Sequence, residues 1–461
     1  MKEGNVGELQ QQLLVRRFRL SLNVYFVLEA LWGCTSGIYV SLVAITIGLV
    51  EAKVLTVILI LGISMLIQAI LEFPLGYLAD RIGKTLIIKM AYLFRASSLG
   101  IYALVAFKGN MIAKTALDKN ILESGVLLYV AIAEILFGAA AALRSGALDA
   151  WIINQRRRVN PSGKDDAMFA RAGYLFYSGM AGFGALALLL APSSPALPWV
   201  FGCAVSIIAL GFSIGFVKPG RAMLQTGLTS DSDSQVEEKT EASIREILRY
   251  LKSRTAVKLV LIGFTCCYLG WWFVGYLYTG VISREVEIVK SWSWLPAVTW
   301  LLVSIARVCT NSLTIRLANR GVSRRARLLF GVLSNSFAIL VASSMLIFLS
   351  GQSSVIMFIV LPLMIIAARA GQELTDPTLS GLLNTTIDRD DIRASLLSLE
   401  GLLTSASVFL MTIVPFVLGF NTKNLPNVLV GYSWLLVGLI VVIGILPLLR
   451  VFKLPGGEHY L

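Results

Sequence analysis

The sequence has few charged residues for its length, and this shortage argues against a soluble globular protein. Only 15% of its 461 residues are Asp, Glu, Lys or Arg, whereas 56% are hydrophobic. A soluble domain carries roughly 25% charged residues. The hydrophobic residues instead gather in runs of about 20 residues, the length that an α-helix needs to cross a bilayer. The composition therefore indicates an all-α membrane protein.

Side chains that carry out enzyme chemistry are also scarce. The single histidine, His459, argues against a histidine-dependent triad or metal cluster. The five cysteines fall within apolar runs and are odd in number, so we expect neither a disulfide framework nor a zinc site. The sequence contains no G-x-x-x-x-G-K-[ST] loop, so ATP is not expected to be the direct energy source. We therefore predict that the protein is not an enzyme and needs no cofactor or metal.

Twelve apolar segments are long enough to span a bilayer. Basic residues collect in the loops on one side, roughly four for each one on the other side, and such loops face the cytoplasm. Both termini lie on that side, so we expect a multi-pass protein of the inner (cytoplasmic) membrane with cytoplasmic termini. The predicted spans are 20–49, 54–78, 85–107, 122–150, 167–190, 197–217, 256–282, 292–316, 326–349, 353–384, 393–419 and 426–449.

A polar segment divides these spans into two sets of six. It begins with TGLTSDSDSQVEEKTEAS and continues with ASIREILRYLKSR, which places Ile244, Ile247, Leu248 and Leu251 on one helical face. This pattern predicts an amphipathic helix, either on the inner membrane surface or in a solvated linker. The predicted units are an N-terminal six-helix bundle at 1–217, a cytoplasmic linker with this helix at 218–255, and a C-terminal six-helix bundle at 256–461.

The two halves resemble each other in sequence. SGALDAWI at 145–152 ends the fourth span, and SGLLNTTI at 380–387 ends the tenth. LADR at 78–81 and LANR at 317–320 both end the second span of their half. These matches indicate two six-helix repeats around a central cavity, an architecture in which secondary transporters bind substrate near the midplane.

GYLADRIGKTL at 76–86 resembles the G-x-L-a-D-r-x-G-r/k signature of the major facilitator superfamily. With twelve spans, basic inner loops and a degenerate second copy near 314–325, the resemblance covers the whole chain. RSGALDAW at 144–151 looks most like bacterial drug-efflux members. Span five reads GYLFYSGMAGFGAL and lacks the Gly-Pro-x-x-Gly-Gly element of many drug/proton antiporters, which leaves the direction of transport open.

The resemblance implies a conformational latch in this stretch. Asp80 would hold a neighbouring helix end, that of span eleven, through charge and helix-dipole contacts and so stabilise the outward-facing state. Gly76 allows close helix packing, and Gly83 permits the tight reversal. Arg81 and Lys84 fit the excess of basic residues on the cytoplasmic side.

Ionisable residues within the spans are candidates for proton coupling or substrate binding, because each costs ~2.5–3.5 kcal/mol at mid-bilayer. Glu134 and Arg369 are repeat-equivalent, each ~16 Å along its helix from the repeated Ser-Gly. We expect them to face the cavity as a gate or substrate clamp; the alternative is a salt bridge within one half. The resemblance implies a role in proton transfer for Arg144. Glu29 and Glu400 are either titrating acids or hydrogen-bonded structural acids. The candidate set is Glu29, Glu134, Arg144, Arg369, Glu373, Asp376 and Glu400; Glu72, Arg95, Asp149 and Arg307 also lie within spans.

Aromatic residues near these charges could stack on a flat or cationic ligand. The alternative is an aromatic belt at the membrane interface. The predicted cavity aromatics are Tyr25, Trp32, Tyr174, Tyr177, Tyr268, Trp271 and Trp272.

These features favour a secondary active transporter that exports a small amphipathic or drug-like compound by alternating access in exchange for protons. The main alternative is an importer or facilitator of a nutrient such as a sugar or organic ion, and a lipid flippase or membrane-embedded enzyme is a more distant one. Despite the net charge of +13, we expect membrane lipid and no nucleic acid as a partner, because basic inner loops face anionic headgroups. We expect a monomer.

Overall fold

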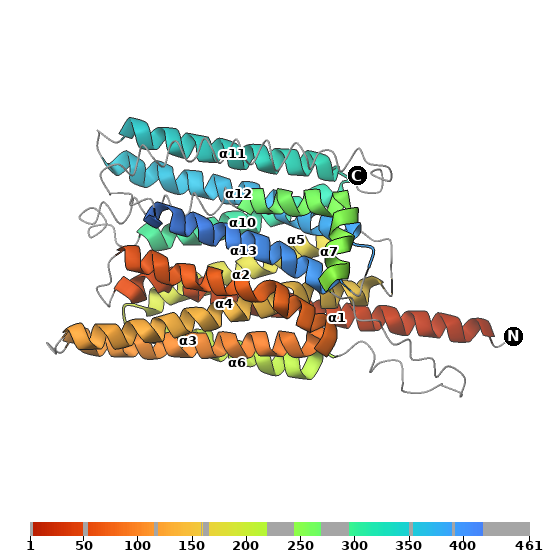
Figure 1. Ribbon diagram of the computed structural model, residues 1–461, viewed down its shortest axis with the longest axis horizontal. Coiled ribbons are helices and arrows are strands. Elements are labelled where there is room, and N and C mark those ends of the chain that lie inside the picture. The colour runs from red at the N-terminus through yellow and green to blue at the C-terminus, as the bar shows by residue number, and fades with distance from the viewer. Residues whose placement is uncertain are drawn as a thin grey trace.

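The computed structural model is a bundle of long α-helices that run roughly parallel to one another (Figure 1). It describes residues 3–48, 54–114, 119–157, 159, 166–218, 244–268, 295–349, 354–389 and 392–417. Every regular element within these ranges is a helix. The predicted twelfth span, 426–449, lies outside the described residues.

The described helices coincide with the predicted spans. Those of the N-terminal half are α1 (Glu3–Gly48), α2 (Val54–Ile82), α3 (Lys84–Lys114), α4 (Lys119–Arg157), α5 (Asp166–Leu190) and α6 (Leu197–Phe216). After α7 (Ile244–Ser253), the C-terminal half contains the apolar helix Thr255–Tyr268, then α10 (Leu295–Asn319), α11 (Arg324–Leu349), α12 (Ser354–Thr386) and α13 (Arg393–Val417).

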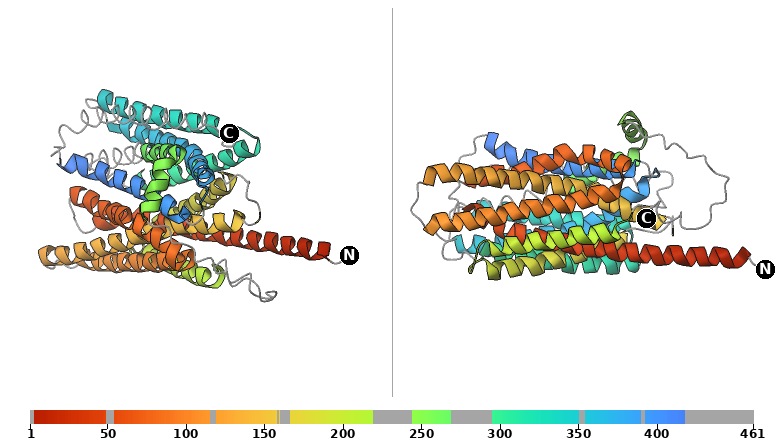
Figure 2. Two further views of the ribbon diagram at one scale, coloured as in Figure 1. Left: turned by 45° about the vertical axis from the view of Figure 1, so that its right-hand side comes forward. Right: turned by 90° about the horizontal axis from the view of Figure 1, so that it is seen from below.

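The largest difference in bounds concerns the first helix, which begins at Glu3 and not at residue 20. Glu, Leu, Gln and Arg dominate residues 8–19, and all four are good helix formers, so the helix continues beyond its apolar part. This extension projects beyond the other helices (Figure 2).

Seven helices within the described ranges are long and apolar enough to cross a membrane. Two shorter apolar helical segments, Thr255–Tyr268 and Ser395–Leu410, accompany them. The protein is therefore a multi-pass membrane protein, as predicted.

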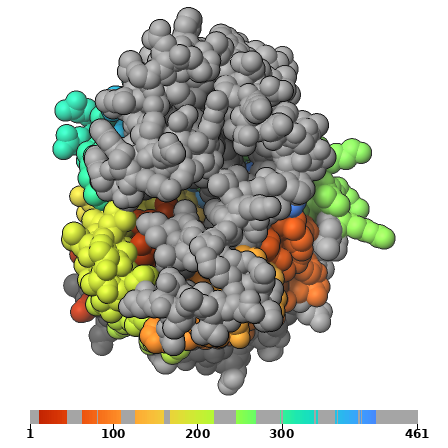
Figure 3. Space-filling model, turned by 90° about the vertical axis from the view of Figure 1, so that its left-hand side faces the viewer, coloured from red at the N-terminus to blue at the C-terminus, as the bar shows by residue number. Residues whose placement is uncertain are grey.

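Two turns reverse the chain at the same end of the bundle. Gly83 separates α2 from α3, and Gly321 separates α10 from α11; their φ angles are 102° and 76°. This end also carries Arg157 at the end of α4 and the short helix α7, which lies across the other helices (Figure 1). We call it the basic end, because Arg81, Lys84, Arg156, Arg157, Arg316, Arg320, Arg324 and Arg325 lie there. Figure 3 looks along the bundle from the opposite end, with α6 and α7 on opposite flanks.

We expect Gly83→Ala to destabilise the protein by about 1–2 kcal/mol, because a side chain at positive φ is strained. No atom lies within 4 Å of a Cβ placed there, so the cost comes from the backbone alone. Gly211→Ala in α6 is the matched control, since its Cβ would also meet nothing within 4 Å; it should be neutral or stabilising by about 0.5–1 kcal/mol. Equal unfolding midpoints for the two purified variants would contradict this explanation.

Helix packing differs within and between the halves. Within the N-terminal half, α1 lies along α5 and α3 along α4 and α6. A Cβ on Gly33 or Gly37 of α1 would collide with the carbonyl oxygen of Phe176 or Met180 of α5, so these two backbones touch. The halves meet where α13 packs against α2 and α4, and where α5 packs against α10 and α12. We call these contacts the seam.

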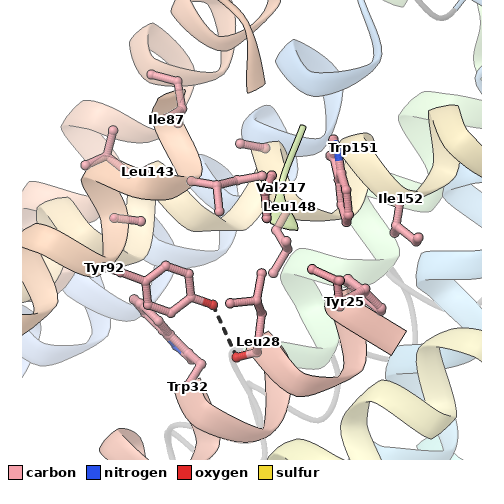
Figure 4. Packing of buried hydrophobic residues seen from close by; sticks show 14 of the residues in the cluster. Tyr25, Leu28, Trp32, Ile87, Tyr92, Leu143, Leu148, Trp151, Ile152 and Val217 are labelled. Carbon is pink, nitrogen blue, oxygen red and sulfur yellow. Dashed lines mark hydrogen bonds between the residues drawn. The ribbon is translucent and has the colours of Figure 1, made fainter. Parts of the chain in front are cut away.

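The core of the N-terminal half is aromatic and aliphatic. Tyr25, Leu28 and Trp32 of α1 pack against residues of α3 and α4 (Figure 4). The hydroxyl of Tyr92 donates a hydrogen bond to the carbonyl of Leu28 at 3.2 Å (Figure 4). This core holds the charged side chains of α1 and α4 in fixed positions.

Candidate functional site

Arg144 of α4 is neutralised inside the N-terminal half. It forms an ion pair with Glu29 of α1, and its guanidinium carbon lies 4.9 Å from the centroid of the Trp32 ring. Nearby, the hydroxyl of Tyr25 donates to Oδ1 of Asp149 at 2.9 Å. The structure thus brings together four predicted residues, Glu29, Arg144, Tyr25 and Trp32.

Arg95 of α3 is buried among aromatic rings. Its guanidinium lies 3.8 Å from the ring centroid of Phe137 and 4.6 Å from that of Trp32. Its nitrogens donate to Oγ1 of Thr35 at 3.2 Å and to Oγ of Ser36 at 3.0 Å. Cation–π contacts and hydroxyl acceptors therefore stabilise this charge.

Glu134 of α4 is fully buried, with no exposed surface. It accepts a hydrogen bond from the hydroxyl of Tyr39 at 2.8 Å and another from Tyr102, whose ring stacks on Trp199. These contacts come from α1, α3 and α6 of the same half.

Arg369 of α12 is buried as well, and one guanidinium nitrogen lies 3.5 Å from Oε1 of Gln372 on the same helix. These contacts of Glu134 and Arg369 lie within their own halves. A joint role across the cavity stays a prediction.

Arg307 of α10 is held by a second buried cluster. Its Nε donates to Oε1 of Glu373 on α12 at 2.5 Å, and Nδ2 of Asn311 donates to Oε2 of the same carboxylate at 2.7 Å. The guanidinium carbon lies 3.7 Å from the ring centroid of Tyr177 on α5. Because α5 belongs to the other half, this cluster lies on the seam.

Acidic side chains gather elsewhere on the seam. Glu72 of α2 accepts a hydrogen bond from Ser145 of α4, and its carboxylate occupies the place that a Cβ on Gly401 of α13 would take. Asp376 of α12 accepts from Nε2 of Gln372 at 2.7 Å.

Glu400, adjacent to Gly401, has three carboxyl groups within electrostatic range, those of Glu72, Asp149 and Asp376. We call Glu72, Asp376 and Glu400 the seam acids. Tyr268 lies within electrostatic range of Asp376 and Glu400.

The remaining predicted aromatics are dispersed. Tyr174 is 38% exposed on α5, while Trp271 and Trp272 lie outside the described residues. Sequence analysis placed Glu72, Asp149 and Arg307 within spans but gave them no role, and it missed Asn311 and Ser145. Two signals could have found the last pair: Asn311 lies four residues after Arg307 on one helix face, and Ser145 begins the repeated Ser-Gly.

The predicted latch is described only in part. The guanidinium of Arg81 lies 4.7 Å from the ring centroid of Tyr77, and Gly76 is buried within α2. Lys84 begins α3 directly after Gly83. The side chain of Asp80 lies outside the described part of the chain, so its role as a latch stays a prediction.

A different contact joins the two halves at the basic end. Nη2 of Arg157 on α4 donates to the carbonyl oxygens of Asn384 at 3.0 Å and Ile387 at 3.1 Å, at the end of α12. Arg393 of α13 donates to the same two oxygens, at 3.0 and 2.8 Å. The last carbonyls of a helix lack partners within it, and cations there also offset the helix dipole.

Helix α7 packs onto the same place. Ile247 and Tyr250 are buried in one hydrophobic cluster with Leu383 and Ile387, and the hydroxyl of Tyr250 donates to Oδ1 of Asp388 at 2.6 Å. Burial and then this hydrogen bond raise the pKa of Tyr250 to about 12. The hydroxyl therefore keeps its proton at neutral pH, and the stability it contributes falls as the pH rises from ~10, the unfolded value, towards 12.

No group of three or more His, Cys, Asp or Glu side chains that could hold a metal ion occurs in the described ranges.

Three solved structures with similar folds are those of transporters. A bacterial homologue of the iron transporter ferroportin, in an outward-facing state, has a TM-score of 0.62 and 13% identity, and the match covers 94% of this chain and 99% of that one. The proton:xylose symporter XylE has a TM-score of 0.65 and 14% identity, with coverage of 95% and 96%. The human organic anion transporter MFSD10 has a TM-score of 0.58 and 14% identity, with coverage of 92% and 99%.

No protein-family model and no curated protein sequence matches the chain. At these identities, the matches establish the fold. They confirm the predicted class of an all-α, multi-pass membrane protein. The chain therefore has the fold of the major facilitator superfamily transporters.

Proposed function

We propose that the protein is a secondary active transporter that exports a small amphipathic compound by alternating access in exchange for protons. The observation that carries this proposal is the position of the buried charges. Glu72, Glu400, Asp376 and the Arg307–Glu373 pair lie on the seam. In a two-repeat transporter the seam is where substrate and coupling ion bind.

The moving bodies in this proposal are residues 1–217 and 256–461, joined by the linker at 218–255. The basic end faces the cytoplasm of the cell that carries the protein in its inner membrane, following the positive-inside rule. The Arg157 contact closes that end, so we assign this conformation to the outward-facing side of the cycle. A monomer suffices, because both repeats belong to one chain.

Each ionisable residue then has a proposed role. Glu400 and Asp376 bind substrate or proton at the seam. Glu29 and Arg144 form a pair whose separation would follow protonation of Glu29. Glu134 on α4 and Arg369 on α12 lie at equivalent depths in the two repeats and couple to substrate or proton. Glu373 holds Arg307 against α5.

Inside-out vesicles test this proposal. We expect an acidic lumen to drive uptake of amphipathic compounds, because protons leaving the lumen run down their gradient as substrate enters. Glu400→Gln should reduce this gradient-driven uptake by at least about tenfold if that carboxyl carries charge through the cycle. Glu246→Gln makes the same chemical change on α7 and should leave uptake unchanged. If whole cells instead accumulated the compound in response to the proton gradient, the protein would be an importer. A flux that did not depend on the proton gradient would contradict proton coupling.

A further inference from the structure

We propose that the transported compound is an organic cation whose positively charged centre binds among the seam acids, between Asp376 and Glu400. This inference rests on the proposed function for its claim of transport, but the binding site itself stands on the geometry of the seam.

Three arginines inside the bundle are already engaged, and a guanidinium nitrogen of Arg369 lies 3.5 Å from Oε1 of Gln372. Arg144 pairs with Glu29, and Arg307 pairs with Glu373. Arg95 lies between two rings and donates to two hydroxyls. An anionic substrate would have to displace one of these partners, which would leave a buried carboxylate or an aromatic cage without its cation.

The seam acids, in contrast, have unused acceptor capacity. Glu72 has no exposed surface, and its carboxylate points from α2 against Gly401 of α13. Its Oε2 has no hydrogen-bond partner within the described chain, and the same holds for the buried Oδ1 of Asp376. Within the described ranges, the carboxyls of Glu72, Asp376 and Asp149 act electrostatically on Glu400, whereas Arg307 and Arg369 act on Asp376 together with Glu373. A buried carboxylate oxygen without a donor is costly, and a cation beside it would offset that cost.

The neighbourhood fits an organic cation better than a metal ion. Tyr268 lies within electrostatic range of Asp376 and Glu400, and an aromatic ring beside a positive nitrogen adds a cation–π contact. A divalent cation would need several oxygen ligands at close range, and the described residues contain no such group.

Equilibrium binding to the purified protein in detergent tests this site. The probe is tetraphenylphosphonium, with ethidium as a flat cation and tetraphenylborate as the anion of matched shape. We expect saturable binding of the cations, weakened at least about tenfold by Glu400→Gln and by Asp376→Asn, since each removes one charge from the site. Glu246→Gln should bind as the wild type does. Unfolding curves check that each variant is folded, and Glu72→Gln provides a third position if one fails.

Three results would overturn the inference: no saturable binding of either cation, equal binding of tetraphenylborate, or unchanged binding in both seam variants. The assay uses no gradient, so it is separate from the test of transport. Cation binding without flux would support the cation site and contradict the proposed transport. Gradient-driven flux of anionic or neutral compounds without cation binding would support transport and contradict the cation site.

Discussion

Glu373→Leu is expected to destabilise the protein by about 3–5 kcal/mol and to abolish transport, because it leaves a buried arginine without its counter-charge. Arg307 is 5% exposed and Glu373 is 2% exposed. Both oxygens of this carboxylate are occupied, one by Arg307 and the other by Asn311 at 2.7 Å. The substitution therefore also removes the acceptor of a buried amide.

The double variant Arg307→Leu/Glu373→Leu separates charge from packing. With both charges gone, we expect most of the lost stability to return, because apolar side chains of similar volume often replace a buried pair without loss. Transport should stay absent, since the contact of Arg307 with Tyr177 across the seam is also lost.

An exposed pair is the natural control. Arg254 and Asp388 form an ion pair whose side chains are 54% and 53% exposed, and such pairs contribute at most about 1 kcal/mol. Denaturant unfolding of purified variants measures all these differences. If Glu373→Leu were no more destabilising than Arg254→Gln, the buried cluster would not contribute as we describe.

Arg157→Ala is the second large effect and should open the basic end. Two charge-assisted hydrogen bonds from α4 to the end of α12 disappear, each worth roughly 1.5–3 kcal/mol. We therefore expect the ratio of closed to open basic ends to fall by at least about tenfold. Overall folding should persist, because Arg393 still supplies donors to the same carbonyls.

Spin labels at Ile82 and Asn319, in a background without native cysteines, report the distance between the halves at this end. Both positions are exposed, and they belong to α2 and α10. Arg393→Ala is the matched control: it removes bonds to the same oxygens from within the C-terminal half, so the distance should not change. An unchanged distribution in Arg157→Ala would show that this contact does not hold the halves together.

The helices were predictable because each apolar run carries its own signal. Residues 197–217 and 393–419 were placed within a few residues of α6 and α13. The turn at Gly83 was predictable too, since the sequence between two spans leaves room for nothing but a tight reversal. The bounds of α1 were wrong at the start, because helix propensity continues where hydrophobicity ends.

The pairing of charges was not predictable in this way. Arg144 is next to Ser145 in sequence yet pairs with Glu29 on another helix, and only helix packing decides this. Arg157 was counted among the basic residues of an inner loop, but its partners are backbone carbonyls. Every residue has a carbonyl, so the sequence holds no signal for such an acceptor.

Helix α4 carries Arg144, which pairs with Glu29, Ser145, which donates to Glu72, and Arg157, which contacts the end of α12. It has 39 residues. At 1.5 Å per residue it is a rod ~58 Å long, and tight contacts such as that of Gly138 with the backbone of Ser64 on α2 make it part of a stiff body. When such a rigid helix tilts about its middle, its two ends move in opposite directions. A tilt of ~10° about its middle moves its ends by ~5 Å, further than the 3.0 Å that separates Arg157 from the carbonyl of Asn384. A small rotation near Arg144 is therefore large enough to part the halves at the basic end.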